Sequence, residues 1–261
     1  MEAQPEKLIA TTSRLQYFLA SITPGKTIYI DFEGFKLGRN GTISLLTIHI
    51  IDGLTLDTSL DSSNAETALA ELRDRTGIID ITALQQRAFS TSSNANSTLK
   101  DILESPNITK YIWDVRRPAN ALWYLYNIRL AGVIDIQLLD SFTRESPEKP
   151  VRTMASRFYQ QVHNVSWMTE AEQDEWIETR DVVEYWADPK IWEKRPLGKE
   201  VLKYCVGQVV YLPRLVKALE VNARGRRRVE EESGKRVDRA TGEEYDPDAV
   251  PDSQSPFGYV R

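Results

Sequence analysis

Two carboxylates at the end of a predicted strand are the first residues in this sequence whose spacing could support chemistry. Asp31 and Glu33 lie at the end of the segment 27–32, which is rich in β-branched and aromatic residues and predicts a strand. Residues i and i+2 of a strand point to the same face, so the two carboxylates would lie side by side. Such a pair is costly unless a cation lies between them, and Mg²⁺ takes hard oxygen ligands of this kind. Alone, this tripeptide is a weak signal, because it recurs by chance at many solvated strand ends.

A second pattern lies in the last predicted helix of regular length. Tyr204 and Gln208 are four residues apart and share one face of a helix predicted from about 197 to 212. Alone, this spacing is more typical of a core helix that carries one aromatic side chain. The pair would indicate a functional site only if the fold brings this helix against the end of the strand that carries Asp31 and Glu33.

The elements that must position these residues form a mixed pattern. The predicted strands are 27–32, 43–50, 77–82, 109–113 and 132–137, and Asn40-Gly41 predicts a hairpin between the first two. The predicted helices are 13–22, 99–104, 118–128, 152–162, 169–178 and 197–212. Three strands in a row, then helix and strand in alternation, then helices, predict an α/β domain with a mixed β-sheet flanked by helices.

The length of 261 residues suits one large domain. We expect an N-terminal tail and short helix at 1–24, and a domain at 25–222 with an insertion at about 52–76. Residues 223–261 are dense in both charge signs and then in Pro, Asp and Ser, which predicts a charged, partly disordered tail.

Charge and cysteine content narrow the classes of protein. The net charge of −5 excludes a global basic field, so any nucleic-acid groove would have to be a local patch. The single cysteine, Cys205, excludes an internal disulfide and suits a reducing compartment such as the cytosol or nucleus. No segment approaches the roughly 18 apolar residues of a membrane span, and the N-terminus does not resemble a signal peptide. We therefore expect a cytoplasmic or nuclear protein that does not bind membranes.

Together, three segments resemble a known domain. Residues 27–34 (TIYIDFEG), 111–140 and 195–215 follow one another as in the 3′–5′ exonuclease domain of the DEDD superfamily, tyrosine subgroup, and are most similar to eukaryotic relatives of ribonuclease D. The resemblance covers roughly residues 25–220, and three motifs in order are far more specific than any one of them. It implies an RNase H-like fold, the 3′–5′ exonuclease fold, and hydrolysis of the 3′-terminal phosphodiester with two divalent metal ions.

The resemblance also implies roles for individual residues. Asp31 and Glu33 match the metal ligands of the first motif, and Tyr204 matches the tyrosine that orients the attacking water. The family has an aspartate four residues after that tyrosine, where this chain has Gln208. The metal-binding aspartate of the second motif falls at Pro118. Two of the four carboxylates are therefore replaced.

The implied site is degenerate, as in a pseudoenzyme. Gln208 offers a neutral carbonyl oxygen and Pro118 offers no side-chain ligand, so any Mg²⁺ or Mn²⁺ would be weakly bound. Because the two-metal mechanism needs both ions, hydrolysis should be weak or lost. Asp114, four residues before Pro118, is a further candidate ligand, although a helix-entry carboxylate is the simpler interpretation.

Basic residues near the predicted cleft are candidates for nucleic-acid binding. Lys36 and Arg39 lie in the hairpin after the paired carboxylates, and Arg116 and Arg117 follow the fourth strand. With aromatic residues nearby, they could hold phosphates while bases stack. The most basic run, 224–228, is followed by acidic residues and indicates a solvated helix end.

Three functions remain open from the sequence. The first is an exonuclease-family domain that binds single-stranded nucleic acid, with RNA favoured, and hydrolyses it poorly or not at all. The second is an active metal-dependent 3′–5′ exonuclease, a phosphodiester hydrolase, with a rearranged site. The third is a scaffold for a protein partner, which would use the insertion 52–76 and the Trp-rich stretch 167–192.

Overall fold

The computed structural model describes residues 7–51, 75–94, 96–144, 149–160, 167–184, 188–219, 221–249 and 253–257. In this part of the chain one six-stranded sheet has the order β1-β4-β3-β2-β5-β6. The strands are β1 (Leu8–Ile9), β2 (Thr27–Glu33), β3 (Leu45–Ile51), β4 (Thr76–Asp80), β5 (Thr109–Ile112) and β6 (Val133–Asp135). Because β2 pairs antiparallel with β3 and parallel with β5, the predicted mixed sheet is confirmed.

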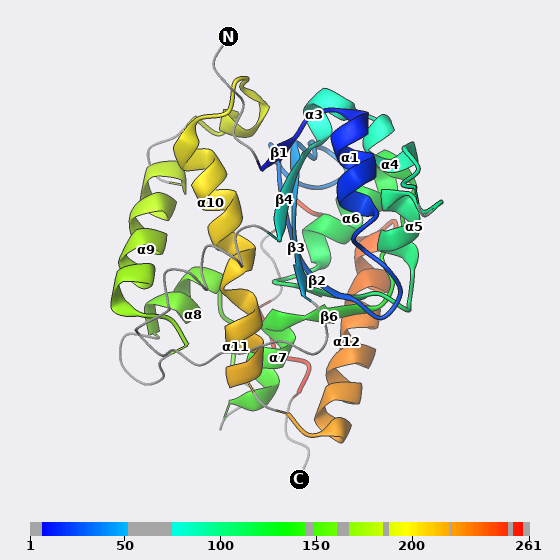
Figure 1. Cartoon of the computed structure of the whole chain (residues 1–261). Coiled ribbons are helices and arrows are strands. Elements are labelled where there is room, and N and C mark those ends of the chain that lie inside the picture. Colours follow the sequence, from blue (N-terminus) through cyan, green and yellow to red (C-terminus); the bar gives the residue numbers. More distant parts are fainter. Residues whose placement is uncertain are drawn as a thin grey trace.

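Helices cover both faces of the sheet, which confirms the α/β class (Figure 1). One face carries α1 (Thr12–Leu19), α4 (Arg87–Ser90), α5 (Leu99–Glu104) and α6 (Arg116–Tyr126). The other carries α8 (Met154–Gln160), α9 (Glu170–Glu184), α10 (Lys199–Val210) and α11 (Leu212–Ala218). The remaining elements are α3 (Ile81–Leu84), α7 (Ile136–Thr143), the 3₁₀ helix η2 (Ile191–Glu193) and α12 (Ala223–Thr241). Among the described helices, none has the length and hydropathy needed to cross a bilayer.

The alternation of side chains along β2 decides which face carries its carboxylates. Ile30 and Phe32 pack into the core beneath α1 and α6. Tyr29 packs into the opposite core, beneath α10, and Asp31 and Glu33 follow it at the same phase of the strand. The two carboxylates therefore face the α10 side of the sheet.

Two predicted strands are shorter than expected because an aspartate ends each of them. The third predicted strand stops at Asp80 and the fifth at Asp135. The Asp80 carboxylate accepts the backbone N–H of Ala83 at 2.9 Å, and that of Asp135 accepts the N–H of Gln137 at 3.0 Å. These contacts cap α3 and α7, two helices that the sequence pattern did not predict.

The C-terminal part of the chain differs from the expectation of a loose tail. Residues 223–241 form α12, which buries Val229 and Arg236 and packs against α6, α7 and β6. The charged first half of the expected tail is a packed helix, because its small and apolar positions recur at helical spacing among the charges. The boundary at residue 222 stays a prediction, and the predicted insertion at 52–76 lies almost entirely outside the described residues.

Two tryptophans of the Trp-rich stretch serve the core. Trp167 and Trp176 are buried, and their rings contact Phe158 at centroid distances of 4.8 and 4.3 Å. They pack α8 and α9 against the sheet and are not available as docking residues. Trp186, which belongs to the same predicted surface, lies outside the described residues.

His49 on β3 gives the fold a testable pH dependence. Its side chain is buried and its Nδ1 lies 2.9 Å from Thr76 Oγ1. Burial, with the positive charges of Arg75 and Lys7, lowers the pKa of His49 from 6.5 to about 4. The unfolded chain therefore binds this proton more readily than the folded protein, so stability is lost as pH falls through this window.

Between pH 7 and pH 4.5 we expect the wild type to lose roughly 2–3 kcal/mol more stability than a His49→Asn variant. Asparagine can keep a polar contact to Thr76 without titrating. Urea denaturation of both proteins at the two pH values measures the difference, and carboxyl groups elsewhere cancel in the comparison. Equal losses in the two proteins would show that His49 is not the titrating group.

Candidate active site

The structure brings β2 and α10 together, as the three motifs predict. α10 packs on β2 and β3, and Tyr204 in the middle of α10 is buried. Tyr204, Glu33 and Asp31 lie close enough for their side chains to interact electrostatically. Residues from opposite ends of the domain are thus brought close together.

A close approach of two backbone segments fixes the chain directly after Glu33. A Cβ at Gly34 would lie 2.0 Å from the Thr42 carbonyl oxygen, so only glycine fits there. The Phe35 N–H donates to Thr42 Oγ1 at 3.1 Å, and that hydroxyl donates to Glu193 at 3.2 Å. This loop holds the end of β2 and ties it to η2.

Burial and mutual repulsion perturb the two carboxyls of β2. Burial raises the pKa of Asp31 from 3.8 to about 6, against the opposing effect of hydrogen bonds to Glu33 and the backbone. Burial and the adjacent Asp31 carboxylate raise the pKa of Glu33 well above its usual 4.5. Within the described part of the chain, Asp31 Oδ2 is buried without a hydrogen-bond partner. Two acids this close favour a shared proton or a bound cation.

Glu184, the last residue of α9, adds a third carboxylate that the sequence did not point to. Its Oε1 accepts the Tyr204 hydroxyl at 2.8 Å, and its Oε2 pairs with Arg180 one helical turn earlier. Burial, followed by the charges of Glu33 and Glu184, raises the pKa of Tyr204 well above 10.0. The only sequence signal is the Arg180/Glu184 spacing, which is typical of any solvated helix.

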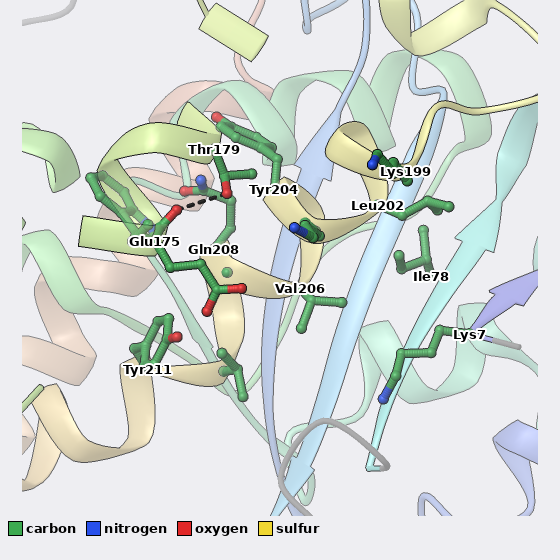
Figure 2. Close-up of a pocket in the computed structure, with 14 residues that line it drawn as sticks. Lys7, Ile78, Glu175, Thr179, Lys199, Leu202, Tyr204, Val206, Gln208 and Tyr211 are labelled. Carbon is green, nitrogen blue, oxygen red and sulfur yellow. Dashed lines mark hydrogen bonds between the residues drawn. The ribbon is translucent and has the colours of Figure 1, made fainter. Parts of the chain in front are cut away.

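The two positions at which the resemblance implies aspartates, 118 and 208, carry no negative charge. Gln208 is buried one turn after Tyr204, with 2% of its surface exposed. Both side chains line a groove of about 320 Å³ along α10, to which α9 contributes Thr179 (Figure 2). Pro118 is buried in the first turn of α6.

Asp114 is held by arginine side chains. Arg116 Nε and Nη2 donate to the two carboxylate oxygens of Asp114 at 2.6 and 2.7 Å. Burial alone would raise the pKa of Asp114, but Arg116 and Arg236 hold it below 3.8. A metal-binding role for Asp114 stays a prediction, and it would require this bidentate ion pair to open.

The four basic candidates for nucleic-acid contacts lie in different surroundings. Arg116 is engaged with Asp114, as described above. Arg39 donates from Nη2 to the Glu243 carbonyl oxygen at 3.0 Å, which ties it to the segment after α12. Lys36 and Arg117 are exposed, the first just beyond β2 and the second at the start of α6. The nucleic-acid role of all four stays a prediction.

A family model described as a 3′–5′ exonuclease matches residues 55–223. The match includes Pro118, Tyr204 and Gln208 and begins after Asp31 and Glu33. In contrast, no curated protein matches the chain. More than half of the sequence therefore falls within one family model.

Solved structures of low sequence identity share the fold. Trypanosoma brucei RNase D in complex with GMP matches with a TM-score of 0.67 and 19% identity, over 95% of this chain and 68% of that one. The same protein with RNA U12 gives 0.66 and 18%, over 94% and 75%. Escherichia coli RNase D gives 0.53 and 18%, over 90% and 50%. With the family match and the convergence of β2 and α10, these likenesses lead to one conclusion: the chain belongs to the 3′–5′ exonuclease family of the DEDD superfamily and has a ribonuclease D-like fold.

Proposed function

We propose that this domain binds single-stranded RNA and that its 3′–5′ hydrolytic activity is weak or lost. One observation carries the proposal: Asp31 and Glu33 are present, but Pro118 and Gln208 stand where the resemblance implies two further aspartates. RNA is favoured over DNA because the T. brucei RNase D that this chain resembles has been solved with RNA U12.

Exonucleases of this superfamily generally use divalent metal ions. The β2 carboxylates fit one such ion, because the unpartnered Asp31 Oδ2 and the raised pKa values of Asp31 and Glu33 reflect charge that a cation would stabilise. A bound Mg²⁺ or Mn²⁺ would supply Lewis-acid polarisation of a phosphate oxygen. Gln208 and Pro118 do not fit a second ion. We therefore expect one ion, weakly held.

The contacts of Tyr204 also support weak hydrolysis. Its single O–H is donated to Glu184 at 2.8 Å. A phenol has only one proton to donate, so in this arrangement Tyr204 can only accept a hydrogen bond from a water molecule near Glu33. Lys36 and Arg117 are the exposed cations best placed to hold backbone phosphates, one beyond β2 and one at the start of α6.

Glu184 favours a second candidate, an active exonuclease with a rearranged site. As a third acid beside Glu33 and Tyr204, it could replace one of the lost aspartates. Within the described residues, no group of three or more His, Cys, Asp or Glu side chains is arranged to hold a metal ion. Glu184 would therefore have to leave Arg180 and turn toward Glu33.

A digestion assay separates the two candidates. A 5′-labelled single-stranded RNA is incubated with the protein and Mg²⁺ or Mn²⁺, beside an Asp31→Asn variant. We expect no shortened products above the Asp31→Asn background. Metal-dependent shortening by the wild type alone would refute the loss of hydrolysis and support the rearranged site.

Binding is measured separately by fluorescence anisotropy. We expect salt-dependent binding of the same RNA, weakened roughly tenfold in a Lys36→Gln, Arg117→Gln variant as two phosphate contacts are lost. Arg227→Gln, at an exposed position of α12, is the matched charge control and should bind like the wild type. No binding by the wild type at low salt would refute the RNA-binding half of the proposal.

A further inference from the structure

A basic cluster lies beside α7, α8 and α11 (Figure 1), and none of its residues belongs to the site described above. Its pocket of about 410 Å³, here called the basic pocket, is lined by Arg144, Arg152, Arg157 and Lys217, together with Asp140. Four cations and one carboxylate leave three net positive charges among the described lining residues. In a chain of net charge −5, this is a marked local concentration of positive charge.

Asp140 lies at the base of the basic pocket and is nearly inaccessible, with 2% of its side chain exposed. Its Oδ1 lies 3.2 Å from Arg157 Nε and 4.0 Å from Arg152 Nη1, so both arginines converge on one oxygen. Burial raises the pKa of Asp140 and lowers that of Arg157. The charges of this pocket therefore interact with little screening by water.

Arg152 and Arg157 together carry more donors than the Asp140 carboxylate can accept. Each guanidinium carries five N–H donors, whereas one carboxylate has two oxygens. In the described part of the chain, Arg157 Nε and Asp140 Oδ2 are both buried without a hydrogen-bond partner, so Arg157 and Asp140 form an ion pair without a hydrogen bond through Nε. The 4.0 Å approach of Arg152 is also too long for a hydrogen bond. Arg144 is held in place by the carbonyls of Lys149 and Pro150, each at 2.9 Å.

We propose that the basic pocket binds a phosphate group. A phosphate brings several strong acceptor oxygens and one or two negative charges, which match both the donor surplus and the three net positive charges. Guanidinium groups suit this ligand because their planar fork can bind two of its oxygens at once. The same chemistry is offered by a backbone phosphodiester of RNA and by a terminal or free phosphate.

The position of the basic pocket is compatible with a strand that extends from the candidate active site. Tyr204 on α10 and Lys217 on α11 lie on helices stacked end to end (Figure 1). At about 1.5 Å per residue, the two positions are separated by on the order of 20 Å along the helix axes. The RNA form of the proposal rests on the proposed function, whereas binding of free phosphate does not.

Isothermal titration calorimetry with inorganic phosphate, at ionic strength held constant with chloride, tests the pocket itself. We expect saturable binding that weakens at least tenfold in Arg152→Gln. This variant is chosen because Arg152 is 29% exposed and 4.0 Å from Asp140, so its loss leaves the Asp140–Arg157 pair in place. Arg157→Gln is the second variant, and Arg227→Gln on α12 is the charge control.

Absence of saturable binding in the wild type would overturn the proposal, because it would mean that the pocket is neutralised within the chain. Equal affinity in the wild type and both pocket variants would overturn it as well. Near-ultraviolet circular dichroism of each variant verifies that the fold is retained.

Two RNA oligonucleotides of one sequence, with a 5′-phosphate or a 5′-hydroxyl, then distinguish the sources of phosphate. If the pocket holds the backbone, Arg152→Gln weakens binding of both equally. If it holds a terminal phosphate, only the phosphorylated RNA is affected. If phosphate binds but neither RNA responds to the substitution, the pocket takes a free phosphate compound. Should no RNA bind the wild type, the proposed function fails while the phosphate result stands.

Discussion

Introducing aspartates at positions 118 and 208 should convert the domain into a markedly more active exonuclease. In the Pro118→Asp, Gln208→Asp variant, two new carboxylates would join Asp31 and Glu33 and offset the charge of two divalent ions. Because the two-metal mechanism depends on both ions, we expect shortening of RNA to become at least about 100-fold faster with Mn²⁺. The rate of loss of full-length 5′-labelled RNA, at saturating metal, measures the gain.

Both substitutions suit their local structure. Pro118 lies in the first turn of α6, where an acidic side chain is favoured by the positive end of the helix dipole. Gln208 is buried one turn after Tyr204, and aspartate is shorter by a single methylene. Two further buried acids are costly without a cation, so the variant should be less stable than the wild type in a chelator. Its unfolding temperature should rise more on adding Mn²⁺ than that of the wild type.

Two controls make the result specific. Pro118→Asn with Gln208→Asn gives almost the same shapes without charge and should show no gain in activity over the wild type. Adding Asp31→Asn to the charged variant should remove the gain, because one of the two strand carboxylates is lost. If the charged variant folds but gains neither metal binding nor activity, then the two missing carboxylates are not what limits hydrolysis.

The convergence of β2 and α10 was predictable from sequence only because three motifs in order resemble a known domain. Period-two alternation places Asp31 and Glu33 on one face, and three motifs in a fixed order place Tyr204 beside them. Glu184 was not predictable, because its contact with Tyr204 depends on how α9 packs against α10. In sequence, Arg180 and Glu184 are an ordinary charged pair on a helix.

The charged segments were the least predictable part of the fold. The alternating charges of 223–241 suggested a solvated tail, yet this segment forms α12 and packs on the sheet edge. The basic pocket draws Arg144, Arg157 and Lys217 from separate segments, so no local run of positive charge reveals it. Composition reports the total charge of a segment, but only the tertiary structure decides which charges gather and which are buried.

Arg236→Met should destabilise the fold by about 3–5 kcal/mol, because it removes the counter-charge of a buried carboxylate. Arg236 is 6% exposed and donates from Nη1 to Asp135 Oδ2 at 2.7 Å and to Gln137 Oε1 at 2.9 Å. Asp135 is fully buried and also accepts the backbone N–H groups of Asp114 and Val115 at 3.0 and 3.1 Å. Methionine fills most of the arginine volume, so the loss of charge dominates the expected effect.

The matched control is Arg239→Met, one turn further along α12. Its side chain is 65% exposed and lies 3.8 Å from Glu232, so its removal should change stability by less than about 0.5 kcal/mol. Urea denaturation at pH 7 measures both variants. Adding Asp135→Asn to Arg236→Met should recover part of the loss, since the buried charge disappears while the amide oxygen can still cap α7.

The difference in stability between Arg236→Met and Arg239→Met also shows whether α12 belongs to the exonuclease-like domain. Asp135 joins the end of β5, the start of α6 and the first turn of α7, and Arg236 brings α12 into this junction. If α12 were a dispensable tail, the two methionine variants would unfold at the same urea concentration. If only Arg236→Met unfolds at a lower urea concentration, then α12 stabilises the segment that carries Pro118. Truncation before residue 223 should in that case unfold the whole domain.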